Sequence, residues 1–509
     1  MWIYMPPGSR INSYDNSGRP CAAESISQCV PSYRLLTKTQ INRLHTATLE
    51  ILETMGVRVE HDGARRMLAD AGCILAENGN VCIPGLLVEN ALRSAPSQIT
   101  VYNRHGEAAL RLENRRIHFG MGTDLAKMYD LKTGCLRAST LKDVQIAVHI
   151  ADALPEIDFI ASYAIPTDSP PNLIYVDAFK SLLENSTKPI FFTATGLEDL
   201  AFIRDMAATV VGGTNNLRQK PFWIHYAEPL SPLTHTTSAI NKLLFCADNH
   251  IPITYTPGVM SGATAPITLA GALAQGNAEA LSGIVIHQLR SPGAPIISGI
   301  GMAIMDMVQA TCIYGGPEYR LALSACADLY HHYQIPMWGT AGVTDANCLD
   351  QQAGMEWGIS LMLNAMSGAN LIHDIGYMGQ GTIGHPAALV VCDEIISYVK
   401  RFMRGFDLDD VHLDLDSIRK VGAGGSYLTT RQTAQFFRSE HWYPSLCNRK
   451  PVGIWEKGGA KSMVTVAVEK SREILRGHCP EPLPESVQQE LDSIRSHAES
   501  YLKDVHFET

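Results

Sequence analysis

A histidine and an aspartate follow a short apolar run in the last third of the chain. Residues 370–372 are Asn-Leu-Ile, His373 and Asp374 come next, and Tyr377 lies three positions further on. A histidine at the end of a barrel strand is usually functional, because the loops at that edge surround the mouth where ligands bind. We therefore expect His373 to lie in the functional site.

Other aromatic and polar side chains follow apolar runs in the same way. Tyr226 and Trp338 either wall a pocket or belong to a core, since barrel interiors also take bulky side chains. Asn172 follows the second run. Asp345 precedes a helical pattern and is more typical of a helix cap than of a catalyst. Glu318 is in the first turn of a helical pattern, where an acid also serves simply to complement the helix dipole.

A methionine-rich loop follows the sixth run. It carries Met302, Met305 and Met307 and closes on Gly315 and Gly316. Because methionine is unbranched and polarizable, such a loop can form a soft docking surface for a flat apolar ligand or a partner, although ordinary packing is its commoner role.

Motifs of the common hydrolytic and phosphoryl-transfer reactions are missing from the sequence. There is no G-x-S-x-G, P-loop or H-E-x-x-H, and the glycines within 422–425 do not follow a strand of a dinucleotide-binding unit. The twelve cysteines lack the spacing of a zinc module. A site with aromatic rings, a histidine and few titratable groups fits a reaction without proton transfer, such as attack on a methyl group of a quaternary ammonium.

Short apolar runs alternating with longer helical patterns must position these residues. The eight runs are 117–119, 158–163, 189–193, 222–226, 252–255, 295–298, 336–339 and 370–373. The helical patterns lie near 140–152, 173–186, 197–211, 234–248, 266–289, 317–333, 348–366 and 386–403. Eight such units predict an α/β fold, a (β/α)8 TIM barrel, because an open doubly wound sheet would seldom need so many.

The remaining residues are expected to form additions to this barrel, which spans residues 113–405. Residues 1–31 are rich in Ser, Gly, Pro and Asn, which predicts a loose extension. Residues 32–112 predict a mainly helical N-terminal region, whose first helix follows a Thr37 cap. Residues 406–509 predict an α-rich C-terminal extension packed on the barrel.

The composition is that of an ordinary globular protein, with 46% hydrophobic and 18% charged residues. The net charge of -10 argues against nucleic acid or an anionic membrane as partner, because both select basic patches. A cationic ligand suits this balance better. There is no apolar signal region at the N-terminus and no run of about twenty apolar residues, so we expect a cytoplasmic protein.

Six stretches of the sequence resemble the trimethylamine methyltransferase family. They begin with ATLEILETMG, ATAPITLAGA, YGGPEYRLAL, GVTDANCLDQ, NLIHDIGYM and WEKGG, and the similarity runs from about Leu36 to Leu483. The resemblance implies a (β/α)8 barrel that passes a methyl group from an amine to the cobalt of a separate corrinoid protein. Founding members carry pyrrolysine, whereas this chain contains only the twenty common residues. It is similar to the branch without pyrrolysine, whose known members demethylate quaternary amines such as glycine betaine.

The resemblance therefore implies a methyltransferase that moves a methyl group from a quaternary amine, glycine betaine first, to the Co(I) of a cognate corrinoid protein. The chain itself is expected to bind no cofactor tightly. In this hypothesis Tyr226, Trp338 and Tyr377 hold the trimethylammonium by their aromatic faces. His373 and Asn172 bind the substrate carboxylate by hydrogen bonds.

The loop after the sixth run supplies the expected corrinoid-facing residues, Met302, Gly315 and Gly316. We assign no catalytic acid or base and no metal ligand. Carnitine, proline betaine or choline remain alternative substrates, and a non-catalytic betaine-binding protein is an alternative of a different class. A metal-dependent hydrolase is disfavoured, because clusters of His and Asp at successive strand ends are missing. The exposed helices also predict a homo-oligomer.

Overall fold

The computed structural model describes residues 28–505 and residue 507. The expected loose extension at residues 1–31 therefore lies almost entirely outside the described residues. The part of it that is described contains a short strand, β1 (Gln28–Cys29), which pairs antiparallel with β21 (Phe406–Asp407).

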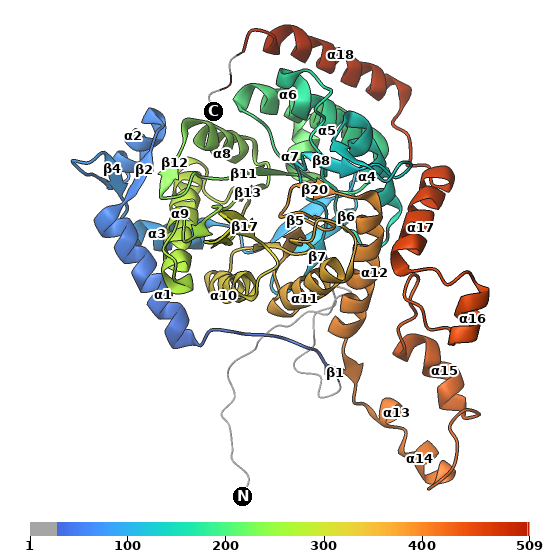
Figure 1. Cartoon of the computed structure of the whole chain (residues 1–509). Coiled ribbons are helices and arrows are strands. Elements are labelled where there is room, and N and C mark those ends of the chain that lie inside the picture. Colours follow the sequence, from blue (N-terminus) through green and yellow to red (C-terminus); the bar gives the residue numbers. More distant parts are fainter. Residues whose placement is uncertain (1–27, 506, 508–509) are drawn as a thin grey trace, which may run out of the picture.

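Parallel strands form the centre of the fold (Figure 1). They are β7 (His118–Phe119), β10 (Ile190–Phe192), β11 (Trp223–Ala227), β13 (Ile253–Tyr255), β15 (Ile296–Ser298), β18 (Trp338–Thr340) and β19 (Leu371–His373). Each coincides with one of the apolar runs of the sequence. The expected second run, 158–163, forms no regular strand, but its residues 159 and 160 make parallel bridges to Gly120 and Ile190.

The pairing order follows the chain order around this centre. Strands β10, β11, β13 and β15 are neighbours in that order, and Ser298 at the end of β15 bridges to Met337 beside β18. Strand β18 pairs with β19, and β19 pairs with β7. The parallel pairings therefore pass through all eight expected runs and return to the first.

A long helix follows each parallel segment. These helices are α4 (Leu141–Ala153), α5 (Ile174–Asn185), α6 (Leu197–Val210), α8 (Thr237–Asn249), α9 (Leu269–Arg290), α10 (Pro317–Tyr333), α11 (Gln351–Ser367) and α12 (Pro386–Met403). The largest differences from the expected starts, three residues, occur at α8, α9 and α11. Capping side chains set two of these starts, because Thr236 accepts from the Ala239 N–H and Asp350 accepts from the Ala353 N–H.

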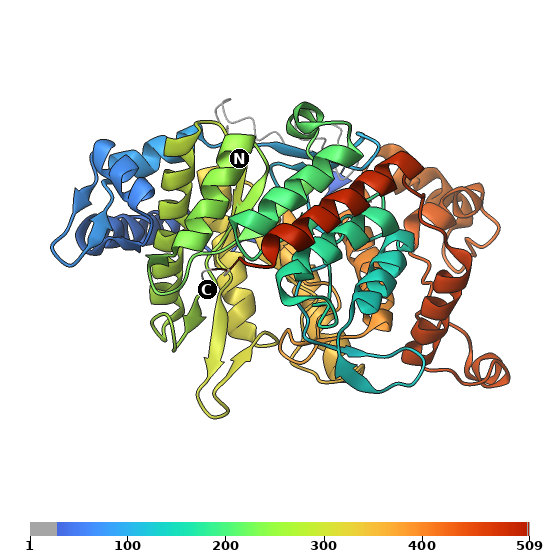
Figure 2. The ribbon, with the colours of Figure 1, turned by 90° about the horizontal axis from the view of Figure 1, so that it is seen from above.

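Smaller elements fill the loops between strands and helices. They are β8 (Lys127–Tyr129), β9 (Leu136–Ala138), η2 (Pro171–Leu173), α7 (Thr214–Gln219), β12 (Thr234–His235), β14 (Met260–Ser261), β16 (Ala303–Asp306), β17 (Thr311–Ile313) and β20 (Ile383–Gly384). The hairpins β8–β9 and β16–β17 follow strand ends and project from one side of the molecule, at the bottom of Figure 2. We call this side the mouth face, and it faces the reader in Figure 1.

The N-terminal region packs on the outside of the helical layer. It contains α1 (Lys38–Glu50), η1 (Ile51–Met55), β2 (Val57–Val59), α2 (Asp62–Asp70), β3 (Ile74–Leu75), β4 (Asn80–Cys82), α3 (Gly85–Ser94), β5 (Ile99–Tyr102) and β6 (Ala108–Leu112). The expected Thr37 cap is present as a capping box with Gln40. Helices α1 and α3 both pack against α9, so this region shares the apolar core of the barrel.

The C-terminal region differs sharply between its two halves. It contains α13 (Asp410–Leu413), α14 (Leu415–Val421), α15 (Arg431–Glu440), α16 (Val452–Lys457), α17 (Met463–Gly477) and α18 (Glu485–Leu502). Helix α17 packs against α12 and α4, and α18 packs against α6. Helices α13–α16 instead project from the side of the barrel beyond α12, at the lower right of Figure 1. Within residues 28–505 and 507, no helix combines the length and the apolar character needed to cross a bilayer.

Candidate active site

Three of the predicted site residues meet: Tyr226 and His373 near the mouth ends of β11 and β19, and Trp338 from the start of β18. The ring centroids of Trp338 and His373 are 4.6 Å apart, those of Tyr226 and His373 6.1 Å, and those of Tyr226 and Trp338 6.3 Å. Phe191 of β10 adds a fourth ring, 5.1 Å from that of His373. Because successive side chains of a strand alternate, β11 turns Tyr226 toward this group and His225 toward the helices. Trp338 is buried, whereas Tyr226 remains partly accessible.

Neither ring nitrogen of His373 makes a hydrogen bond within the described residues, although Nδ1 is close to a carboxylate. Its Nδ1 lies 2.6 Å from Asp374 Oδ1, and its Nε2 has no hydrogen-bond partner among the described residues. The carboxylate of Asp374 sits against Gly122 of the first strand's loop, at a place that a Cβ atom would fill. A glycine at 122 therefore allows Asp374 to lie close enough to orient the imidazole.

Glu228 lies beside the aromatic group, two residues beyond Tyr226. Its Oε2 accepts a hydrogen bond of 2.9 Å from the Tyr226 hydroxyl. The side chain is accessible to solvent, yet the surrounding protein removes much of its hydration, and this desolvation raises the pKa of the carboxyl. The site thus combines aromatic faces with an accessible acidic group.

Tyr377 and Asp124 lie in the loops that follow β19 and β7. The Tyr377 hydroxyl donates to the carbonyl of Thr123, and its ring lies 5.7 Å from that of Tyr163. Asp124 Oδ2 accepts from Thr123 Oγ1 at 3.1 Å and from the Tyr175 hydroxyl at 3.3 Å. Burial raises the pKa of Asp124 to about 6. Because the Tyr377 hydroxyl is already bonded, Tyr377 can offer a ligand only its ring.

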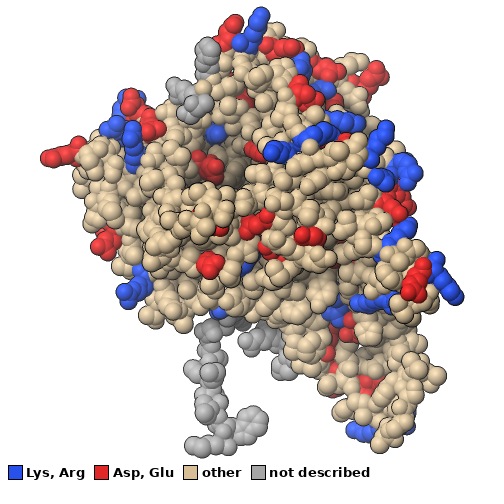
Figure 3. Space-filling model, viewed as in Figure 1, with Lys and Arg blue, Asp and Glu red and all other residues tan. Residues whose placement is uncertain are grey.

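The mouth face is hollowed at this place. Figure 3 shows the hollow over the part of the molecule where Figure 1 labels β11 and β13, with acidic and basic side chains inside it. Glu228 and Lys242 are accessible or half-buried charged residues next to β11, and each lies within electrostatic range of the other. The hollow is therefore charged as well as aromatic.

Two predicted site residues lie outside this group. The Asn172 amide donates to the carbonyls of Leu502 and Val505, at 2.6 and 3.2 Å, so it binds the end of α18 and not a ligand carboxylate. Met302 is fully buried, so it presents no surface to a corrinoid. In both cases the side chain is used by the fold itself.

Asp345 has a role that was not expected from the sequence, because it supports the loop after β17. The two carboxylate oxygens of Asp345 accept from the N–H groups of Tyr314 and Gly315, each at 2.9 Å, so it braces this loop and caps no helix. Gly315 packs against the Glu356 carboxylate, and Gly316 is the N-cap of α10. Both glycines are half-buried.

Sequence reasoning missed the charged and aromatic neighbours of His373. Glu228 follows the fourth strand and was visible as a mouth residue, but nothing in the sequence pairs it with Tyr226. Phe191 has the pattern of a core residue. Lys242 is an isolated lysine in an amphipathic helix, a position that is usually solvated. Only the convergence of neighbouring βα units brings these residues to one place.

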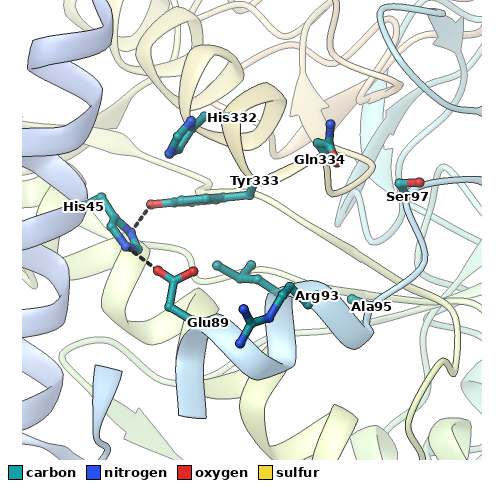
Figure 4. Close-up of a pocket in the computed structure, with 9 residues that line it drawn as sticks. His45, Glu89, Arg93, Ala95, Ser97, His332, Tyr333 and Gln334 are labelled. Atoms are coloured by element: carbon teal, nitrogen blue, oxygen red, sulfur yellow. Dashed lines mark hydrogen bonds and ion pairs between the residues drawn. The ribbon is translucent and has the colours of Figure 1, made fainter. Parts of the chain in front are cut away.

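A second cavity lies at the other end of the barrel. It has a volume of about 400 Å³ and is bordered by α1, α3 and the end of α10 (Figure 4). Within it His45 Nδ1 lies 3.0 Å from the Tyr333 hydroxyl and His45 Nε2 lies 2.9 Å from Glu89 Oε1. Tyr333 ends α10 just before β18 begins, on the face where residues serve stability more than catalysis. We interpret this cluster as a clamp that joins the N-terminal helices to the barrel.

The fold and the site together define a class, an α/β protein whose parallel strands present an aromatic and acidic mouth suited to a cation. Comparisons with known proteins agree with this class. The chain resembles the monomethylamine methyltransferase structure of Methanosarcina barkeri, with a TM-score of 0.52 at 12% identity, over 93% of this chain and 90% of that one. At this identity the likeness shows the fold alone, a TIM barrel of the kind expected.

Sequence relatives are considerably more similar. The chain is 32% identical to a trimethylamine methyltransferase of Desulfitobacterium hafniense, over 89% of this chain and 92% of the relative. It is 29% identical to a glycine betaine methyltransferase of the same species, over 92% and 98%. The trimethylamine methyltransferase (MTTB) family model matches residues 9–499. The chain therefore belongs to the trimethylamine methyltransferase family, and it is a methyltransferase.

Proposed function

We propose that this methyltransferase takes a methyl group from a quaternary amine, with glycine betaine as the first candidate, and delivers it to a corrinoid carried by a separate protein. The observation that carries the proposal is the group of rings around His373 with the Glu228 carboxylate beside it. Ring faces and a nearby negative charge both attract a methylated cation. The relatives named for trimethylamine and for glycine betaine support a methylated amine as substrate.

A quaternary amine also fits the chemistry that the chain can perform. Its nitrogen is already positive and leaves as a neutral tertiary amine, so no general acid is needed. This favours a quaternary over a tertiary amine in a chain without pyrrolysine. The corrinoid, when its carrier is docked, supplies a nucleophilic cobalt to accept the methyl group. The protein's own contribution is to orient one methyl carbon toward the opening and to keep water from the ammonium.

Tyr226 and Trp338 would form one continuous wall for the ammonium. Their rings are inclined by only 19° and their centroids lie 6.3 Å apart, which leaves no room for a trimethylammonium between them. The cation would therefore lie across both faces, with His373 at one edge and Glu228 at the other. Each desolvated face is worth about 1–2 kcal/mol of binding.

The corrinoid carrier would dock on the mouth face. Four exposed apolar residues stand in the loops that follow β11, β13 and β15: Leu230, Ile267, Met307 and Val308. Ile267 and Met307 both lie against Gly262, so part of this rim is continuous. Met307 at the tip of the β16–β17 hairpin takes the exposed position that was expected for Met302. Gly315 and Gly316 remain candidates to face the corrinoid.

The domain organisation is part of the same proposal. A closed (β/α)8 barrel at residues 113–405 would carry the site, residues 32–112 would form the mainly helical N-terminal region, and residues 406–509 would form the C-terminal extension packed on the barrel. The ring of parallel pairings and the packing of α1, α3, α17 and α18 on barrel helices support this division.

The proposal is tested by supplying the purified enzyme with reduced corrinoid acceptor and a panel of amines. We expect methylation of the corrinoid and release of dimethylglycine from glycine betaine, with carnitine, proline betaine and choline as alternative donors. Binding of glycine betaine without any methylation of the acceptor would instead support a betaine-binding protein. Methylation from trimethylamine alone would refute the choice of a quaternary amine.

A substitution in the aromatic wall tests the site itself. Changing Trp338 to Leu should raise the Kd for glycine betaine roughly 5- to 30-fold, because one desolvated ring face worth about 1–2 kcal/mol is lost. Calorimetric titration measures the change, and W338F should recover most of the affinity. The matched control is Trp442→Leu, since Trp442 lies beside Ser397 on α12, away from the mouth. Equal affinities of W338L and the wild type would remove Trp338 from the site.

A further inference from the structure

We propose that Lys242 binds the carboxylate of the substrate, which makes this enzyme selective for betaines, meaning quaternary amines that carry a carboxylate, over uncarboxylated amines such as choline. The inference rests on the proposed function and deepens it. No feature of the sequence pointed to this lysine.

Lys242 reaches the mouth from the helical layer. It lies in the second turn of α8, and its ammonium donates to the carbonyl of Ala194, just beyond β10, at 3.1 Å. Glu228 and Asp124, on the loops of two other strands, are both within electrostatic range. The ammonium is therefore placed at the strand ends, close to the acidic side of the aromatic group.

The hydrogen bonds of Lys242 are incomplete. An ammonium has three N–H donors, but among the described residues Lys242 has one acceptor and no carboxylate within 4.0 Å. Lys188, at the opposite end of the strands, donates to the carbonyls of Ala151, Leu154 and Ile157 at 2.7, 2.6 and 2.7 Å. Lys188 is a fully bonded structural lysine, whereas Lys242 keeps donors for a ligand.

The acids around Lys242 are engaged elsewhere. Asp199 accepts from the N–H groups of Thr195 and Gly196 at the start of α6. Glu228 accepts from the Tyr226 hydroxyl. Burial lowers the pKa of Lys242, and the nearby Asp199 and Glu228 charges oppose this shift without bonding to the ammonium. Two donors of the ammonium therefore stay available to an incoming carboxylate.

The two charges match a zwitterion. Glu228 is within electrostatic range of both Lys242 and His373. An ammonium against the Tyr226 and Trp338 faces would have Glu228 as its counter-charge, and its carboxylate would point toward Lys242. His373 is enclosed by rings and faces Asp374, so it suits the ammonium end. Asn172, the other expected carboxylate ligand, is bonded to the C-terminal segment.

The test compares Kd values for glycine betaine, choline and tetramethylammonium by calorimetry, without any corrinoid. Lys242→Met should raise the Kd for glycine betaine roughly tenfold or more, because a charge-assisted hydrogen bond is lost. The Kd values for choline and tetramethylammonium should change by less than about twofold. K242R should retain most of the betaine affinity. Lys188→Met is the matched control, and it should lower stability without changing the ratio of betaine to choline affinity.

The outcomes separate the two proposals. Loss of betaine affinity alone in K242M supports the inference. Unchanged betaine affinity, or an equal loss for all three ligands, overturns the role of Lys242 while leaving the proposed function intact. A wild-type enzyme that binds none of the three ligands overturns both.

We also infer that the segment from β21 to α16 is an interface with a second copy of this chain. Between residues 406 and 462 only Leu446 is buried. Large apolar side chains are exposed along it: Val411, Leu413, Leu415, Ile418, Leu428, Tyr443, Val452 and Ile454. Leu428 is 86% exposed and Val452 69%. So many large apolar side chains exposed in one segment are unusual for a surface that faces only solvent.

The helices of this segment are too short to be stable alone. They have 4, 7, 10 and 6 residues, whereas isolated helices shorter than about 12–15 residues are marginal in water. Helical stability normally comes from burying an apolar face. Since the barrel buries almost none of this segment, another protein must cover it.

The charge pattern identifies that protein as a second copy. Residues 407–416 contain five Asp and no Lys or Arg, whereas residues 417–438 contain four Lys or Arg and no Asp or Glu. In a two-fold symmetric interface each half meets the other half of the partner. The acidic half of one copy can thus pair with the basic half of the other, around the exposed apolar residues.

Light scattering across a concentration series tests this interface. We expect the wild type to be dimeric or larger and Leu428→Glu to dissociate at least tenfold more readily. Leu86→Glu, at an exposed site on α3, is the control and should leave the assembly unchanged. Reversing charge with R431E and R438E should weaken association, and adding D410K and D416K should restore it. Unchanged betaine affinity of L428E would confirm an intact barrel.

Two results would overturn this second inference. One is a wild-type protein that stays monomeric at all concentrations. The other is an L428E assembly as stable as that of the wild type.

Discussion

Two aspartates of this enzyme show how surroundings decide the protonation of a side chain. Burial at the mouth raises the pKa of Asp124 to about 6 from its ordinary 3.8. Asp130, at the β8–β9 turn, accepts the N–H groups of Thr133 and Lys132 and pairs with Arg137, and its pKa falls to about 2. The same residue type is therefore penalised as an anion at one site and stabilised as an anion at the other.

Asp124→Asn should change stability in a pH-dependent way. The folded state holds the Asp124 proton more tightly than the unfolded chain does. The stability that this protonation contributes is present below about pH 4, falls as pH rises from 4 to 6, and is absent above about pH 6. Because an amide is always neutral, the free energy of unfolding of D124N should exceed that of the wild type by up to about 3 kcal/mol at pH 7.5. At pH 4 the two values should be almost equal. Urea unfolding at the two pH values measures this.

The control substitution should have the opposite effect on stability. Asp130→Asn should destabilise the protein at pH 7.5, because an anion with a lowered pKa is lost. A gain from D124N that is the same at pH 4 and pH 7.5 would show that Asp124 does not titrate as its burial implies.

At the scale of the elements, one carboxylate fastens the C-terminal region to the barrel. Glu394 on α12 accepts from the Ser445 hydroxyl at 2.7 Å and from the N–H groups of Ser445, Leu446 and Cys447 at 2.9 to 3.0 Å. Burial alone would raise its pKa, but the hydrogen bonds from Cys447, Ser445 and Leu446 outweigh it, and the pKa lies below its usual value. Leu446, the one buried residue of residues 406–462, is held here.

Glu394→Ala should release this attachment. The loss of an anion with four donors should lower the free energy of unfolding by about 2–4 kcal/mol and speed proteolysis near residues 440–450. Glu469→Ala is the control, because among the described residues Glu469 pairs only with Lys461, at the surface. Its loss should lower the free energy of unfolding by less than about 1 kcal/mol. In the wild type the contribution of Glu394 is present above its unfolded pKa and is lost as pH falls through the lowered folded value. Protease resistance of E394A equal to that of the wild type would contradict this account.

At the scale of the whole molecule, two surfaces are left for partners. The mouth face carries the hollow (Figure 3). It also carries the exposed apolar residues in the loops after β11, β13 and β15. The segment from β21 to α16 projects beyond α12, to the side of the barrel (Figure 1). Because these surfaces lie on different sides, a second copy could cover one while the corrinoid carrier approaches the other.

The local interactions of this chain were readable in its sequence. Apolar runs and helical periodicity located the parallel segments and the helices after them, because helix and strand patterns depend on neighbours a few residues apart. The Thr37 cap was readable for the same reason. Starts of helices were less certain, as Asp345 and Asp350 show: both precede α11, but only Asp350 lies where its carboxylate meets the first free N–H groups.

Contacts between distant segments were decided by the tertiary structure alone. The meeting of Tyr226, Trp338 and His373 followed from the order of the strands, so it could be expected from the sequence. The place of Asn172 against α18, the burial of Met302 and the approach of Lys242 to Ala194 could not. Each depends on how one βα unit, or the C-terminal helix, packs against another. Such packing is set by the shapes of many side chains at once, and no local pattern records it.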